Sequence, residues 1–190
     1  MRFLSACAVV ALLCCSALSA QDAPKPEFSP VPLTSAQIAV YRAFLADYNK
    51  GSKGKHNLAD TTDSFQPDKD NFTGCMKDFS RSSKSLKVHN LTQALGEDPN
   101  AHLVDGDGYK VKDVGEWMEK GQTLDTAVDS AVSAGLLTLS EVVFDKTRHQ
   151  AAFHYALSCG RLCGNGGTVV YVLSNGQWRR SKQSCVSWIS

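Results

Sequence analysis

The chain has 190 residues, 43% of them hydrophobic, with 20 basic and 19 acidic side chains. Nucleic-acid-binding domains carry a clustered basic excess, so this balanced charge excludes nucleic acid as an expected partner. The length is usual for one domain, and no apolar run after residue 20 is long enough to span a membrane.

Residues 1–20 have the pattern of a secretory signal peptide. One positive charge precedes an apolar run from Leu4 to Leu18, and small residues end at Ala20. We expect cleavage after Ala20 and therefore a secreted or periplasmic mature protein. Cys7 lies in a motif like a bacterial lipoprotein box, but most of the apolar run follows it, which favours the signal peptide.

The mature chain is expected to begin with a Pro-rich, extended lead-in over residues 21–33, followed by a single domain over residues 34–190. Apolar residues three and four apart predict a helix that is capped by Thr34 or Ser35 and ends before Gly51. The first ordered element of the domain should therefore be an amphipathic helix.

The middle of the chain is predicted to hold short elements. An extended piece over residues 56–60 precedes a helical face over residues 70–79, which would turn Cys75 inward. A short strand is predicted over residues 101–104 and a short helix over residues 124–134.

The last third is rich in strand-forming residues and turn signals. Asn175-Gly176 between two such segments is typical of a tight hairpin. Consecutive strands joined by short turns should pair antiparallel. We therefore expect an α+β fold in which N-terminal helices pack on a C-terminal four-stranded antiparallel meander stapled by disulfides. The four expected strands cover residues 136–144, 150–158, 168–173 and 177–190.

Four cysteines remain after signal cleavage, and an even number in an oxidising compartment predicts two disulfides. Four cysteines allow three pairings, among which the sequence alone does not choose. We favour a pair of Cys159 with Cys163, closing a glycine-rich loop. The other pair would be Cys75 with Cys185, joining the helical half to the last strand.

Four short motifs mark residues 135–190: SEVVFD, CGRLCGNG, NGQW and the terminal WIS. They resemble a group of uncharacterised, predicted secreted bacterial proteins that share an SxVxFD strand, a CGxLCGxG loop, a GxW hairpin and a WxS end. The resemblance supports the Cys159–Cys163 pairing and supplies no reaction. Cys75 and Cys185 lie outside the shared pattern, which agrees with a separate second bridge.

His154 is the side chain that we single out as ligand-facing. It lies mid-strand with parity opposite to Phe153 and Tyr155, so it should face solvent or a shallow cavity on the other side of the sheet. Asp105 and Asp107 start a stretch that fails the calcium-loop pattern and predicts a solvated turn. We expect no metal and no cofactor.

These patterns favour an exported, non-enzymatic binding or interaction module with an unknown ligand or protein partner and no catalytic residues. The alternative is an extracytoplasmic enzyme. It would be either a thiol redox protein using Cys159 and Cys163, or a hydrolase using His154 and an acidic loop over residues 60–70. Asn71 and Asn90 begin glycosylation sequons.

Overall fold

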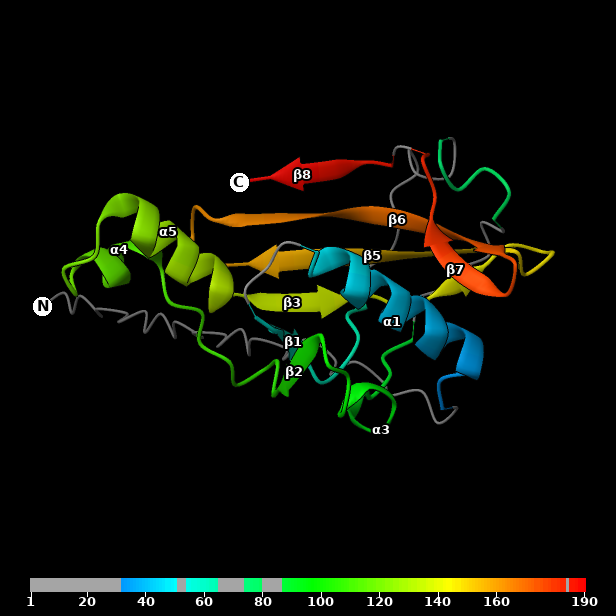
Figure 1. The fold of residues 1–190 in the computed structure, drawn as a ribbon, viewed down its shortest axis with the longest axis horizontal. Helices are drawn as coiled ribbons and strands as arrows, with labels where there is room; N and C mark the ends of the chain where they lie inside the picture. Colours follow the sequence, from blue (N-terminus) through cyan, green and yellow to red (C-terminus); the bar gives the residue numbers. More distant parts are fainter. Residues whose placement is uncertain (1–31, 51–53, 65–73, 80–86, 184) are drawn as a thin grey trace, which may run out of the picture.

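The structure of the protein is a computed structural model. It describes residues 32–50, 54–64, 74–79, 87–183 and 185–190. Its centre is an eight-stranded mixed sheet with the order β2-β1-β3-β5-β6-β7, in which β4 also pairs with β5 and β8 with β6 (Figure 1). Among the described residues, no helix is long and apolar enough to cross a membrane.

The strands in chain order are β1 (His56–Ala59), β2 (Ala101–Val104), β3 (Leu136–Leu139), β4 (Val143–Phe144), β5 (Gln150–Ser158), β6 (Gly164–Ser174), β7 (Gln177–Arg180) and β8 (Ser187–Ile189). The helices are α1 (Ser35–Tyr48), α3 (Thr92–Leu95), α4 (Val114–Met118) and α5 (Leu124–Ser133). β1 runs parallel to both β2 and β3, whereas the other paired strands are antiparallel.

The predicted fold, N-terminal helices on a four-stranded antiparallel meander, is wrong. The chain instead forms a curled mixed sheet with few helices, because the short segments β1 and β2 join the same sheet in parallel. Parallel pairing depends on contacts between distant segments, which a local pattern does not reveal. In addition, the strand expected over residues 136–144 is split into β3 and β4, and the last expected strand is split into β7 and β8.

Several local predictions are confirmed. β5 has the predicted bounds, β2 forms where a short strand was expected, and β6 and β7 form the hairpin signalled by Asn175-Gly176. Both turn residues have positive φ, as a tight hairpin turn requires. Of the helical face predicted over residues 70–79, residues 70–73 lie outside the described residues, and residues 74–79 form turns instead of a helix.

α1 begins with a capping box. The Thr34 side chain accepts the backbone N–H of Gln37 at 3.3 Å, and the Gln37 side chain accepts the backbone N–H of Thr34 at 2.9 Å. The buried face of the helix packs on the sheet, where the rings of Phe44 and Phe153 meet edge to face at 5.1 Å. The Tyr41 hydroxyl donates to the Ser140 carbonyl at 2.8 Å, which anchors α1 where β3 ends.

The sheet has two different faces. The α1 face, which carries Leu137, Leu139 and Phe153, belongs to the main hydrophobic core. On the opposite face, Cys75 and Met76 pack against Ala152 and Val170 in a smaller apolar cluster.

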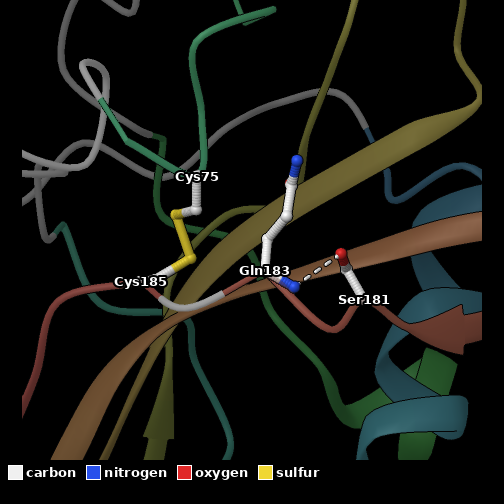
Figure 2. The surroundings of a disulfide bond; sticks show 4 residues. All are labelled: Cys75, Ser181, Gln183 and Cys185. Carbon is white, nitrogen blue, oxygen red and sulfur yellow. Dashed lines mark hydrogen bonds between the residues drawn. A yellow bond between two sulfur atoms is a disulfide. The ribbon is translucent and has the colours of Figure 1, made fainter.

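The bond between Cys75 and Cys185 fixes residues 74–79 to the segment before β8 (Figure 2). In that segment the backbone N–H of Gln183 donates to the Ser181 hydroxyl at 3.1 Å, which turns the chain after β7. Residues 74–79 therefore cover part of the sheet face opposite α1, and the disulfide holds them there.

Candidate functional site

The candidate site lies where the parallel strands end. β1 and β2 are parallel neighbours that end in register at Ala59 and Val104. The residues that follow, Asp60 and Asp105, therefore leave the sheet at the same end of the strands. The backbone N–H of Asp60 donates to the Val104 carbonyl at 2.9 Å, and the Asp60 side chain accepts the Gly106 N–H at 3.4 Å. Ligands of parallel sheets commonly bind at the carboxyl ends of the strands.

The space for a site arises because the chain after β1 leaves β3. Leu58 pairs with Leu137, but the next contact between the two segments is the bridge of Asp63 with Ser140. Between these two contacts, the chain that follows β1 covers five residue steps (58 to 63), whereas the chain of β3 covers three (137 to 140). The chain after β1 therefore has two additional residues, which bulge away from β3. Within this bulge Thr62 donates its backbone N–H to the His89 carbonyl instead.

The resulting opening, which we call the aspartate cleft, has a volume of about 580 Å³. Its walls include Ala59, Val88, Leu136 and Thr138. Its polar lining consists of Asp60, Thr61, Thr62, Asp63, Ser64, Asn90, Asp105 and Asp107. The lining contains no basic side chain, and none of the four aspartates forms a salt bridge within the described part of the chain.

A partly buried polar network holds one wall of the aspartate cleft. His89 Nε2 lies 3.2 Å from a carboxylate oxygen of Glu141, whose other oxygen accepts the Lys87 backbone N–H at 2.8 Å. The backbone N–H of His89 donates to the Thr62 hydroxyl at 2.8 Å. These bonds fix the segment that carries Val88 and Asn90 against the bulge, so the cleft has a defined shape.

Sequence reasoning missed part of this arrangement. Asp60 and Asp63 belong to the predicted acidic loop, whereas Asp105 and Asp107 were predicted to form a solvated turn with no role. The available signal was positional, since Asp60 and Asp105 each directly follow a short strand-like segment. Recognising its meaning required knowing that the two strands are parallel neighbours.

His154 lies on the face of β5 opposite to Phe153, beside Thr168 of β6. It is absent from the residues that line the aspartate cleft, but the carboxylate of Asp63, which does line it, interacts with the imidazole. Burial lowers the pKa of His154, and Asp63 partly offsets this change. A direct contact of His154 with a ligand stays a prediction.

The four cysteines are paired as we favoured, Cys159 with Cys163 and Cys75 with Cys185. The first bond closes the turn between β5 and β6, where the Cys159 N–H also donates to the Cys163 carbonyl at 2.9 Å. Disulfides of this kind are compatible with an extracytoplasmic protein. No group of three or more His, Cys, Asp or Glu side chains among the described residues could hold a metal ion.

The chain matches no protein-family model, no curated protein and no solved structure. The resemblance of its C-terminal motifs to predicted secreted bacterial proteins therefore stays a prediction, as do the redox and hydrolase alternatives.

Proposed function

We propose that the protein is an exported, non-enzymatic binding module that holds a small organic cation in the aspartate cleft. The observation that carries this proposal is the composition of the cleft, in which four aspartates and, among the described residues, no basic side chain line a volume of about 580 Å³. A concave site lined by one sign of charge concentrates ligands of the opposite sign.

The size and the remaining polar groups favour an organic cation over a bare ion. The volume lies within the range of pockets that take small organic ligands. Hydroxyl groups of Thr61 and Ser64 and the amide of Asn90 can accept hydrogen bonds from an ammonium group, while Ala59 and Leu136 can contact a short carbon chain. A primary diamine has this combination of features.

Export is the second part of the proposal. It is supported by the signal-like pattern of residues 1–20 and by two disulfides, which persist in oxidising compartments. A binding module fits such a location because the hydrogen bonds of His89 with Glu141 and Thr62 hold one wall of the cleft in a defined shape. N-terminal sequencing of protein recovered outside the cytoplasm should begin at Gln21, and an intact residue 1–20 segment would contradict this part.

Calorimetric titration of the purified protein tests the cleft. We expect putrescine, a primary diamine, to bind, and 1,4-butanediol, which has the same carbon chain without charge, not to bind. Asp63→Asn and Asp107→Asn should each weaken putrescine binding by about threefold or more, because each removes one carboxylate from the lining of the cleft. The matched control is Asp129→Asn, which makes the same charge change at an exposed position on α5.

Two results would overturn the proposal. Equal affinity for the diamine and the diol would show that charge does not select the ligand. Equal weakening by Asp129→Asn would show that net charge, and not the aspartate cleft, attracts the amine.

A further inference from the structure

We infer that β8 and the pocket beside it form a docking site for an extended peptide segment, which adds to the sheet as a further strand and presents an uncharged apolar side chain to the pocket. This site lies apart from the aspartate cleft and does not depend on the function proposed for it. Three features of the structure point to this site: the unpaired outer side of β8 within the described residues, the lining of the pocket and the close packing of both against β6.

β8 leaves one edge of its backbone open. Gly164 and Ser190 exchange both of their backbone hydrogen bonds, at 3.2 and 2.9 Å, so the neighbouring pair of Asn165 and Ile189 is of the non-hydrogen-bonded kind. The N–H and C=O groups of Ile189 and, by the same alternation, of Ser187 therefore point away from β6. No described strand pairs with β8 on that side.

The edge also lacks the features that normally block added strands. Residues 186–190 contain no charged residue and no proline, and all of them are exposed, with the Ile189 side chain 88% accessible. In contrast, β7 carries Arg179 and Arg180. Charges and prolines on edge strands prevent pairing with other chains, so β8 is more receptive than β7, which pairs with the same side of β6.

A pocket of about 380 Å³ opens next to this edge. Ile189 pairs with Asn165, so both side chains point to the α1 face, as does Tyr155 of β5. Val132 at the end of α5 and the Cys159–Cys163 disulfide also line the pocket, and no side chain among its described lining residues is charged. A side chain on this face of an added strand would lie next to Ile189 and the pocket, and the uncharged lining selects an apolar one.

The site is rigid before any peptide arrives. The Trp188 indole lies so close to β6 that a Cβ atom on Gly166 would come within 2.8 Å of its ring, and only glycine fits there. The disulfide fixes the turn that leads into β6. A pre-organised edge loses little conformational entropy on binding, which favours even a short added strand.

A peptide is a better occupant than a second copy of the chain. β8 has three residues, which is about 10 Å of strand. Pairing two such strands across a two-fold axis would bury far less than the roughly 1,000 Å² that a specific dimer needs. A flexible peptide needs no such area, because it can continue along the edge and use the pocket.

Fluorescence anisotropy with labelled peptides tests the proposal. The probe is an acetylated Thr-Val-Thr-Leu-Thr-Val-Thr peptide, and the full protein should bind it saturably. Replacing its central Leu by Asp should weaken binding by about tenfold or more. Methylating alternate backbone nitrogens should abolish binding, because the peptide can then no longer pair as a strand.

Protein variants locate the site. Ile189→Pro removes the outward N–H and should abolish binding, whereas Ile189→Ala keeps that donor and should retain part of it. Asp63→Asn in the aspartate cleft should bind the probe as the unchanged protein does. The proposal fails if no peptide binds saturably, if the N-methylated peptide binds equally well, or if Asp63→Asn abolishes binding. It also fails if sedimentation shows a dimer that Ile189→Pro dissociates, because a second copy would then be the occupant.

Discussion

The two parts of the sheet are built in different ways. The antiparallel part, from β3 to β8, comes from one continuous stretch of chain and contains the long strands β5 and β6, with nine and eleven residues. The parallel part consists of β1 and β2, with four residues each, which are far apart in the sequence. The long strands contribute more buried core residues than β1 and β2, which end in the loops that form the aspartate cleft.

Aromatic packing follows the same division. In the antiparallel part Phe153 contacts the rings of Tyr41, Phe44 and Tyr171. In the parallel part, the ring contact seen among the described residues is that of His56 with Tyr48, at 5.0 Å. The aspartate cleft therefore lies beside the part of the sheet that contributes fewer residues to the core. This division can be tested by perturbing each part in turn.

The largest expected effect is the loss of the Cys75–Cys185 bond, whose partners are 110 residues apart and enclose the chain from β2 to β7. Replacing both cysteines by alanine should lower the free energy of unfolding by about 4–5 kcal/mol in the loop-entropy model. The same change at Cys159 and Cys163, which are four residues apart, should cost on the order of 2 kcal/mol. Urea denaturation of both double variants measures the difference.

The comparison tests whether the Cys75–Cys185 bond contributes more to the free energy of unfolding than the Cys159–Cys163 bond does. If the Cys159–Cys163 pair contributed more, local strain or packing at the turn would outweigh the closure of the long loop. If its removal left stability unchanged but abolished a thiol-dependent activity, the redox alternative would replace the binding module.

Next in size is the contrast between the two core regions. Phe153 is 1% exposed, and Phe153→Ala should cost about 3–5 kcal/mol because it leaves a cavity between α1 and the long strands. Leu103 of β2 is only partly buried, and Leu103→Ala should cost about 1–2 kcal/mol. Thermal and urea unfolding of the two variants test this ratio. Equal losses would mean that the parallel part is as tightly packed as the antiparallel part.

The same division explains which features the sequence could predict. The β6–β7 hairpin was predictable because its signal, Asn175-Gly176, lies within the turn itself. The helix α1 was predictable because its cap and its apolar face are contained in one segment. β1 and β2 were recognised as short extended pieces, but their place in the sheet was not, since parallel partners are chosen by burial against distant segments.

The candidate site shares this limit. Asp63 and Asp107 are distant in sequence, and they line one cleft only because β1 and β2 are neighbours and the chain bulges before Asp63. Neither the bulge nor the pairing of His89 with Glu141 leaves a pattern in a single sequence. The presence of two disulfides, in contrast, followed from the expected compartment and the even number of cysteines, whereas their pairing was a favoured choice that the structure confirms.

The smallest expected effect is a pH dependence of the free energy of unfolding that arises from a histidine in the parallel part of the sheet. Burial lowers the pKa of His56 in β1, so the unfolded chain takes up a proton at this residue before the folded chain does. Above the unfolded pKa of about 6.5, His56 is neutral in both states and does not reduce the free energy of unfolding. Below that pH, protonation of the unfolded chain lowers the free energy of unfolding by at most about 1.4 kcal/mol per pH unit. His56→Phe should keep the ring contact with Tyr48 and flatten this slope between about pH 6.5 and pH 5.

Urea unfolding across that range measures the slope, with His102→Gln as the exposed control on β2. An unchanged slope in His56→Phe, or an equal change in His102→Gln, would place the acid sensitivity outside the buried end of β1, with His154 on the opposite face as the next residue to replace.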